Sequence, residues 1–222
     1  MNYAAARLNM VESQLRTNKV LDPAVLDAFL TVPRERFVPP SLRGIAYVDD
    51  DVPLGNGRVL MEPMVQARML QVAAVGSQDK VLEIGCATGY ATALVAHLSA
   101  QVTALESDPH FAAQARGLLA ELGLSGVQVV EGELAQGWKA NAPYDVILFN
   151  GAVGEIPPAI AAQLAEGGRL VAVVRPIDGQ SGPSMGEAVL MTRAEGVLSS
   201  RPLFDAAVHP LPGFAPAPSF VF

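Results

Sequence analysis

The segment Lys80–Tyr90, "KVLEIGCATGY", contains the pattern that decides the fold of this chain. Residues 80–84 are mostly apolar and predict a short strand, because a strand covered on both faces forms a nearly continuous apolar run. Gly85 and Gly89 enclose a tight turn, and the following residues 90–99 predict a helix. Strand, glycine-rich turn and helix in this order are typical of the first unit of an α/β fold.

The alternation of strand and helix continues well beyond this unit. Further strands are predicted at residues 102–105, 127–130, 145–149 and 169–174, and helices at residues 64–75, 109–122 and 158–165. Apolar strands separated by helices predict a doubly wound, mostly parallel sheet. In such a sheet the ligand site lies at the carboxyl ends of the strands. The predicted fold class is therefore α/β and Rossmann-like.

The two ends of the chain follow other patterns. Leu8, Val11 and Leu15 recur at helical spacing, and Asp22-Pro23 is a good start for a second helix. Residues 47–63 are rich in Asp, Gly and Pro and predict a long ordered loop. Residues 188–192 and 197–203 predict an antiparallel hairpin, and the Pro-rich tail 209–222 predicts extended chain on the surface. We expect one domain over residues 1–222, with an N-terminal extension (1–64), a ligand-binding core (65–174) and a C-terminal hairpin and tail (175–222).

Composition narrows the class of protein. The net charge of −7 and the lack of an uninterrupted basic cluster argue against a nucleic-acid partner, which requires grouped Lys and Arg. No apolar run approaches the ~18 residues that span a membrane, and no signal peptide is recognisable. Cys86 is the one cysteine, so no intramolecular disulfide forms, and a cytoplasmic location is expected. The three histidines, at positions 97, 110 and 209, show no metal-ligand spacing, so no metal is expected.

The glycine turn has three interpretations. It is an ordinary strand-to-helix turn, a dinucleotide site, or a site for S-adenosylmethionine. A dinucleotide site favours Gly-x-Gly-x-x-Gly, but Ala87 and Tyr90 stand at the second and third glycine positions. Glu83, at the end of the strand, is also unfavourable beside a pyrophosphate. The same carboxylate suits the ammonium group of S-adenosylmethionine.

Acidic residues follow three successive strands and make the third interpretation more specific. Glu106 comes 21 residues after Gly85, where a carboxylate accepts the ribose hydroxyls in related folds. Glu133 follows the next strand and is placed to reach the adenine amino group. With Glu83, these residues form a predicted cofactor site at the carboxyl edge of the sheet. Cys86 and Ala87, which lie between the glycines, are assigned to the same site, Cys86 as a small packing residue rather than a nucleophile.

The chain resembles the protein-L-isoaspartate O-methyltransferases over roughly residues 10–174. The segments that carry the resemblance are "VPRERFVP", "AYVDDDVPLGNG", "VLEIGCATGY", "APYDVILFNGA" and "IPPAIAAQLAEGGRLV". It implies a class I methyltransferase fold, S-adenosylmethionine as cofactor, and methylation of the isoaspartyl carboxylate in damaged proteins, which is a repair function. By match to the motif, Gly85, Gly89 and Glu106 are cofactor residues.

The departures from the family pattern concern the acceptor side. The family's Gly-Gln-Thr-Ile-Ser-x-Pro is here Gly57–Pro63, "GRVLMEP", so Val59 replaces the threonine and Met61 the serine that line the reaction centre. A carboxylate acceptor is already ionised at neutral pH, so the protein mainly orients it, and a lost hydroxyl lowers the rate on the order of 10–1,000-fold. We therefore expect weak or absent isoaspartyl activity.

Other acceptors and roles stay open. The acceptor is a protein or peptide carboxylate or an unidentified small molecule, and the alternative is a cofactor-binding homologue or interaction module without catalysis. Asn150, at the end of the fourth predicted strand, is a second candidate catalytic residue, as a contact to substrate or to the transferred methyl group. Ala87 stands for a family glycine, and Glu133 stands for the Asp of the usual Gly-Asp-Gly.

Overall fold

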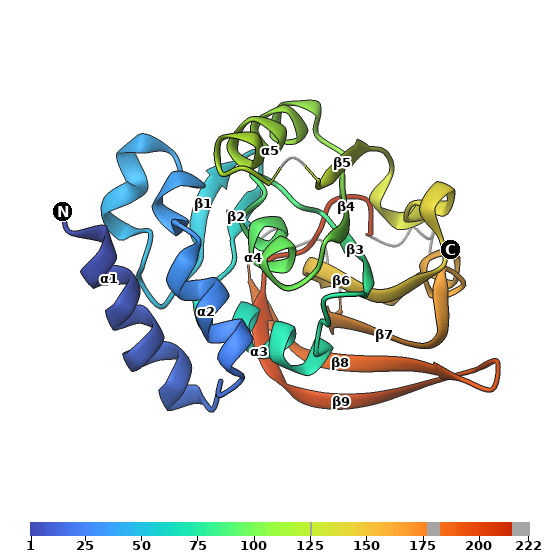
Figure 1. Ribbon diagram of the computed structural model, residues 1–222. Coiled ribbons are helices and arrows are strands. Elements are labelled where there is room, and N and C mark those ends of the chain that lie inside the picture. Colours follow the sequence, from blue (N-terminus) through green and yellow to red (C-terminus); the bar gives the residue numbers. More distant parts are fainter. Residues whose placement is uncertain (125, 177–182, 215–222) are drawn as a thin grey trace, which may run out of the picture.

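The computed structural model describes residues 1–124, 126–176 and 183–214, and it is built on one large sheet (Figure 1). The sheet has seven strands in the order β5-β4-β3-β6-β7-β8-β9. The strands are β3 (Lys80–Ile84), β4 (Gln101–Glu106), β5 (Gln128–Glu131), β6 (Tyr144–Val153), β7 (Leu164–Val174), β8 (Ser184–Ala194) and β9 (Val197–Val208). Strands β3 to β7 pair in parallel, and β8 and β9 add antiparallel. The predicted sheet and C-terminal hairpin are thus confirmed.

The strand order places a topological switch point between β3 and β6. The chain builds β4 and β5 on one side of β3 and then returns to place β6 on the other side. In open α/β sheets, ligands bind in the crevice outside the carboxyl ends of the strands at such a point. The loops after β3 and β6 are therefore the parts of the fold that position a site.

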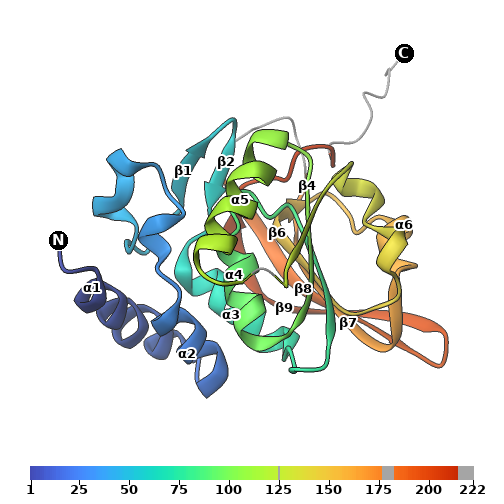
Figure 2. The ribbon, with the colours of Figure 1, turned by 45° about the horizontal axis from the view of Figure 1, so that its top comes forward.

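Helices and short turns cover the sheet (Figure 2). The α-helices are α1 (Tyr3–Met10), α2 (Pro23–Thr31), α3 (Pro63–Ala73), α4 (Tyr90–Leu98), α5 (Pro109–Glu121) and α6 (Pro158–Ala161). Alternate residues of β3 point to opposite faces, so Val81 packs in one apolar cluster and Leu82 in another. The first cluster joins the sheet to α2, α3 and α4. The second contains Ile160 of α6 and Leu211, which follows β9.

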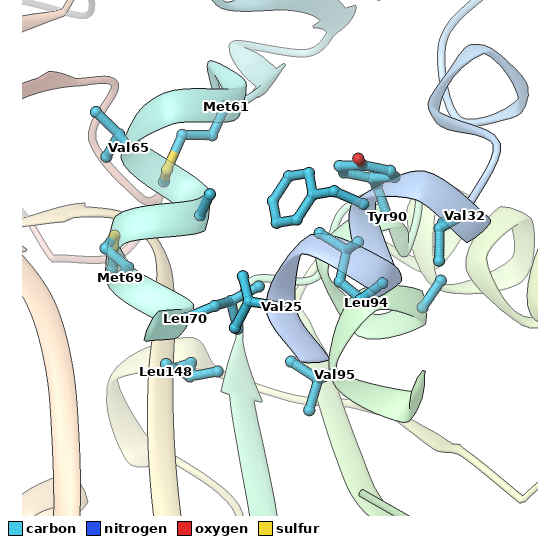
Figure 3. Close-up of a cluster of buried hydrophobic side chains, with 14 of the residues drawn as sticks. Val25, Val32, Met61, Val65, Met69, Leu70, Tyr90, Leu94, Val95 and Leu148 are labelled. Carbon is cyan, nitrogen blue, oxygen red and sulfur yellow. The ribbon is translucent and has the colours of Figure 1, made fainter. Parts of the chain in front are cut away.

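The first cluster ties the N-terminal extension to the core. Figure 3 shows Val25 of α2 beside Leu70 of α3, and Tyr90 and Leu94 of α4 belong to the same cluster. Asp22 caps α2 as predicted, since its side chain accepts the amides of Ala24 and Val25. Leu8, Val11 and Leu15, which recur at helical spacing, all lie in helix; Val11 and Leu15 are buried, whereas Leu8 is half exposed.

Three sequence predictions about local structure are corrected. The expected loop 47–63 contains a hairpin of β1 (Val52–Gly55) and β2 (Arg58–Leu60), and its turn residues Asn56 and Gly57 have positive φ, as such two-residue turns require. The helix expected at 158–165 ends at Ala161, and β7 already begins at Leu164. Residues 209–214 lie only partly on the surface, since Leu211 and Phe214 are buried while Pro212 and Gly213 are exposed. Residues 215–222 lie outside the described part.

The C-terminus of α3 offers a test of backbone strain. Ala74 ends this helix with φ of 47° and is exposed, so it occupies the left-handed region that disfavours a side chain. We expect Ala74→Gly to raise the free energy of unfolding by about 1 kcal/mol in urea titration. Ala73→Gly is the matched control, because the same change at a buried helical residue should lower it by a similar amount. Equal destabilisation by both changes would exclude strain at Ala74.

No helix among the described residues is long and apolar enough to cross a membrane. Nor do the described residues bring together three or more His, Cys, Asp or Glu side chains in a group that suits a metal ion.

Candidate active site

The turn after β3 has the backbone geometry of a ligand-binding loop. Gly85 and Gly89 have φ of 81° and 91°, and Ala87 adopts a left-handed φ of 47°. The amides of Gly85 and Cys86 both donate to the carbonyl oxygen of Leu105 in β4, at 2.8 and 3.2 Å. The turn is therefore fixed to the end of the neighbouring strand, beside the predicted ribose-binding carboxylate.

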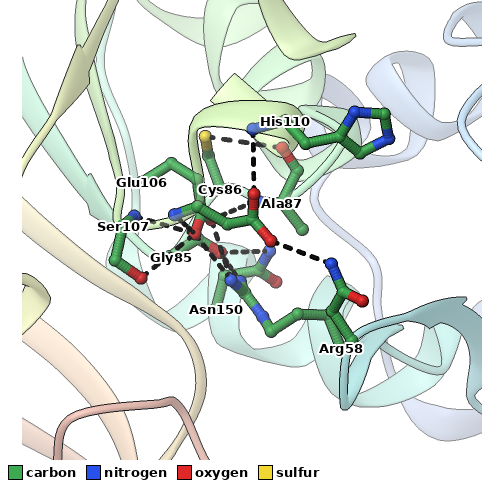
Figure 4. Close-up of polar contacts among 10 residues, drawn as sticks. Arg58, Gly85, Cys86, Ala87, Glu106, Ser107, His110 and Asn150 are labelled. Carbon is green, nitrogen blue, oxygen red and sulfur yellow. Dashed lines mark hydrogen bonds and ion pairs between the residues drawn. The ribbon is translucent and has the colours of Figure 1, made fainter. Parts of the chain in front are cut away.

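Glu106 is buried and its carboxylate is fully engaged by the protein (Figure 4). The backbone amides of Ala87, Ser107 and Asp108 donate to it, at 2.7, 2.8 and 3.0 Å. Arg58 Nη1 donates to both of its oxygens, at 2.8 and 2.9 Å. Ionised donor and acceptor groups make short and strong hydrogen bonds. The oxygens of Glu106 are therefore already bonded from several directions.

Arg58 comes from β2 and reaches the carboxyl edge of the sheet. Its side chain is 6% exposed, and Nη2 donates to the carbonyl oxygen of Gly85 at 2.7 Å. Its guanidinium also stands over the ring of Phe111 in α5, 5.8 Å from the centroid. The guanidinium is thus held by an ion pair, a backbone bond and an aromatic face.

Residues 208–214, here called the C-terminal segment, cross the same site (Figure 2). The amide of Ala152 in β6 donates to the carbonyl of His209, and the amide of Leu211 donates to the carbonyl of Ala152, both at 2.8 Å. His209 Nδ1 lies 2.8 Å from the carboxylate of Asp51. A Cβ on Gly85 would stand 2.6 Å from Leu211 Cδ2, so the Leu211 side chain lies directly on the glycine.

Three predicted residues meet behind this segment. Met61, Glu83 and Asn150 line one small cavity of about 20 Å³. Asn150 Nδ2 donates to the carbonyl of Gly85 at 3.1 Å, and its Oδ1 accepts from Gln66 at 3.3 Å. A second cavity, of about 10 Å³, lies between the β1–β2 hairpin and the C-terminal segment and is also lined by Met61 and Asn150.

Glu83 is fully buried, and burial is the main reason that its pKa rises to about 7. The nearby Glu106 raises the pKa further, whereas a hydrogen bond from Thr92, 2.5 Å from Oε2, lowers it. Its other oxygen, Oε1, has no hydrogen-bond partner among the described residues. A buried carboxyl with a free oxygen at a strand end is a common feature of functional sites.

Met61 is held as part of the apolar core. Its side chain is 3% exposed and lies beside Val65, on the side of α3 that faces the cluster (Figure 3). Its carbonyl accepts from Nη2 of the buried Arg34 at 2.7 Å. Burial lowers the pKa of Arg34, whose guanidinium also stands 4.9 Å from the centroid of the Tyr90 ring.

The remaining predicted residues lie apart from the cavities. Glu133 is exposed at the start of a short turn after β5 and lines neither of the two cavities, so its contact with the adenine amino group stays a prediction. Cys86 is buried in the turn, and burial with two neighbouring carboxylates raises the pKa of its thiol well above the ordinary range. It therefore lacks the thiolate character of a nucleophile. Glu62 is half-buried beside Asp51, and burial raises its pKa to about 7.

Comparison with known proteins decides the family. A family model described as protein-L-isoaspartate(D-aspartate) O-methyltransferase matches residues 6–187. The chain belongs to this family. A protein-L-isoaspartate O-methyltransferase from Methanoculleus marisnigri is 40% identical over 207 residues, 93% of this chain and 91% of the relative. One from Koribacter versatilis is 38% identical over 218 residues, 97% of this chain and 96% of the relative.

Solved structures agree on the fold. A protein-L-isoaspartate O-methyltransferase matches with a TM-score of 0.80 at 23% identity and covers 94% of this chain and 67% of its own. A putative member from Plasmodium falciparum, described in complex with S-adenosyl-L-homocysteine, matches with a TM-score of 0.77 at 18% identity. The match covers 95% of this chain and 98% of the Plasmodium chain. The class I methyltransferase fold is thus confirmed. Family membership also confirms the prediction of an O-methyltransferase whose cofactor is S-adenosylmethionine.

The site in this conformation does not fit that cofactor. Ligand pockets usually measure about 300–1,000 Å³. The two cavities at Met61 and Asn150 measure only about 10 and 20 Å³, and the open hollow of about 450 Å³ at Ser107 and Asp108 has Arg58 in its lining. Glu106 is bonded to Arg58 instead of being open to a ribose, and Leu211 covers the glycine that the cofactor approaches. The residues of a cofactor site are present, but side chains of the same chain fill it.

The residues that fill the site escaped the sequence analysis. Arg58 stands where the family pattern of this segment has Gln, and this departure was a usable signal beside those at Val59 and Met61. Leu211 lies in a Pro-rich stretch that resembles surface chain, and no pattern within it indicates its long-range contact with Gly85.

Proposed function

We propose that this chain is a member of the protein-L-isoaspartate O-methyltransferase family with an altered acceptor site and weak or absent isoaspartyl activity. The observation that carries the proposal is the lining of the two cavities beside Met61 and Asn150. Among the residues that the structure describes, no Ser or Thr hydroxyl lines either cavity. At this position the family has hydroxyl side chains, and here Val59 and Met61 replace them. An acceptor carboxylate therefore lacks the hydroxyl donors that the family pattern supplies at these two positions.

The charge near the cavities supports the same proposal. Glu83 lines the cavity behind Met61, and its unpartnered oxygen is fully buried. A second carboxylate brought next to it experiences repulsion or requires one of the two groups to take a proton. An anionic acceptor is therefore disfavoured here, and a neutral acceptor or no turnover is favoured. The closed cofactor site favours the second candidate, a non-catalytic homologue.

Restoring the hydroxyls tests the acceptor site. We expect the wild type to methylate an isoaspartyl peptide, with radiolabelled S-adenosylmethionine, at least ~100-fold more slowly than the Methanoculleus marisnigri relative measured beside it. Val59→Thr with Met61→Ser should raise the rate at least ~10-fold, because a positioned hydroxyl again orients the carboxylate.

Met64→Ser is the matched control for this assay. Met64 lies in the first turn of α3, three residues after Met61. It is partly buried and lines neither of the two cavities. The control should leave the low rate unchanged. A wild-type rate equal to that of the relative would refute the proposal, and a methylated product with a neutral acceptor would exclude the non-catalytic alternative.

A further inference from the structure

Arg58 and Leu211, here called the plug, stand where the sequence and the family place the cofactor. Each has its own set of contacts. Arg58 forms the ion pair with Glu106 and the bond to the Gly85 carbonyl. Leu211 lies on Gly85 and also on Gly151, where an added Cβ would stand 2.7 Å from its side chain. The two residues are far apart in the sequence, and both lie against Gly85 at the end of β3.

The structure holds both parts of the plug in place. Arg58 is 6% exposed and its partner Glu106 is fully buried, so the pair is shielded from water and each charge needs the other. Leu211 is 4% exposed and is fixed by its backbone bond to Ala152. The contact between His209 and Asp51 attaches the same segment to the chain just before the β1–β2 hairpin.

Arg58 also lies between a large open hollow and a small cavity, and it lines both. On its outer side lies an open hollow of about 450 Å³, lined by Asn56, Ser107, Asp108, Pro109 and Pro212 together with Arg58 itself. On its inner side lies the 10 Å³ cavity, which shares Met61 and Asn150 with the cavity at Glu83. Arg58 is the residue common to the outer hollow and the first inner cavity. Because Arg58 lines both spaces, its displacement would open the hollow toward the cavity at Met61 and Asn150.

The geometry points to a self-closed cofactor site: Arg58 and Leu211 compete with S-adenosylmethionine for Glu106 and Gly85, and the cofactor binds only after they are displaced. This inference rests on the proposed function for the identity of the cofactor. Its consequence is a reduced apparent affinity for S-adenosylmethionine. A ligand that binds only a minor conformation has an apparent dissociation constant equal to the intrinsic one divided by the fraction of molecules in that conformation. Weakening the plug should therefore strengthen binding, although it removes native contacts.

Calorimetry with S-adenosylhomocysteine tests the plug without requiring turnover. We expect Arg58→Gln to bind this probe at least ~10-fold more tightly than the wild type, since the neutral side chain no longer competes as a cation for Glu106. Arg201→Gln removes the same charge from an exposed position on β9 and should bind like the wild type. Equal affinity of the wild type and Arg58→Gln would overturn the inference.

A second variant covers the case in which Arg58→Gln does not fold. Leu211→Ala keeps the ion pair and shortens only the side chain that covers Gly85. It should bind S-adenosylhomocysteine more tightly by at least ~3-fold, and an unchanged or weaker affinity would overturn the inference. Failure of the proposed function shows differently, as family-like isoaspartyl turnover by the wild type.

Discussion

Replacing Glu106 with Ala should lower the free energy of unfolding by about 3–5 kcal/mol, the usual effect of breaking a buried ion pair. The substitution leaves the Arg58 guanidinium at 6% exposure without its counter-charge. It also removes the acceptor of the backbone amides of Ala87, Ser107 and Asp108. Urea unfolding at neutral pH, followed by circular dichroism, measures the difference.

The effect must be specific to the buried pair. Glu131→Ala breaks the exposed pair of Glu131 with Arg116, whose side chains are 42% and 46% exposed, and should change stability by less than about 1 kcal/mol. Adding Arg58→Met to Glu106→Ala should recover part of the loss, because it removes the unpaired buried charge. If Glu106→Ala were as mild as Glu131→Ala, Arg58 and Glu106 would not form the buried pair described above.

Glu83→Gln should stabilise the protein above neutral pH and leave it unchanged below about pH 4.5. The pKa of Glu83 rises from 4.5 to about 7 in the folded protein, mainly because the side chain is fully buried. Between these two values the folded state binds more protons than the unfolded state, so stability falls as pH rises through that window. A shift of this size corresponds to a loss of about 3 kcal/mol in the unfolding free energy of the wild type at pH 8. Glu83→Gln has no titrating group at this position and does not undergo this loss.

The difference between variant and wild type isolates this group from others that titrate in the same range. Unfolding free energies of both proteins measured from pH 4.5 to 8 should diverge with rising pH, with Glu83→Gln the more stable. Thr92 can still donate to the amide oxygen, so its hydrogen bond is retained. Glu155→Gln removes one charge from an exposed position and serves as control. Parallel curves for Glu83→Gln and the wild type would show that Glu83 is ionised in the folded protein.

The sequence predicted the features that local patterns determine. Neighbouring residues determine the strand at 80–84 and the turn at Gly85. The order of the other strands and helices follows from the alternation of apolar runs and helical segments along the chain. Glu83 and Asn150 could be placed together because parallel strands end at one edge of a sheet. Their shared cavity with Met61 shows that this argument from topology holds here.

The sequence did not predict what fills the site, because that depends on contacts between distant segments. Arg58 and Glu106 are 48 residues apart, and no local pattern signals their pairing. Leu211 reaches Gly85 only because β8 and β9 return the chain to the carboxyl end of β6. Glu133 is exposed after β5, so its predicted contact with the adenine amino group stays a prediction.

The structure of the protein crystallised with S-adenosylhomocysteine tests the central claim most directly. If the chain closes its own cofactor site, the ligand's ribose will contact Glu106, the Arg58 guanidinium will have left both Glu106 and the Gly85 carbonyl, and Leu211 will no longer cover Gly85. A complex with the ligand bound at Gly85 while Arg58 still pairs with Glu106 and Leu211 keeps its bond to Ala152 would contradict the account.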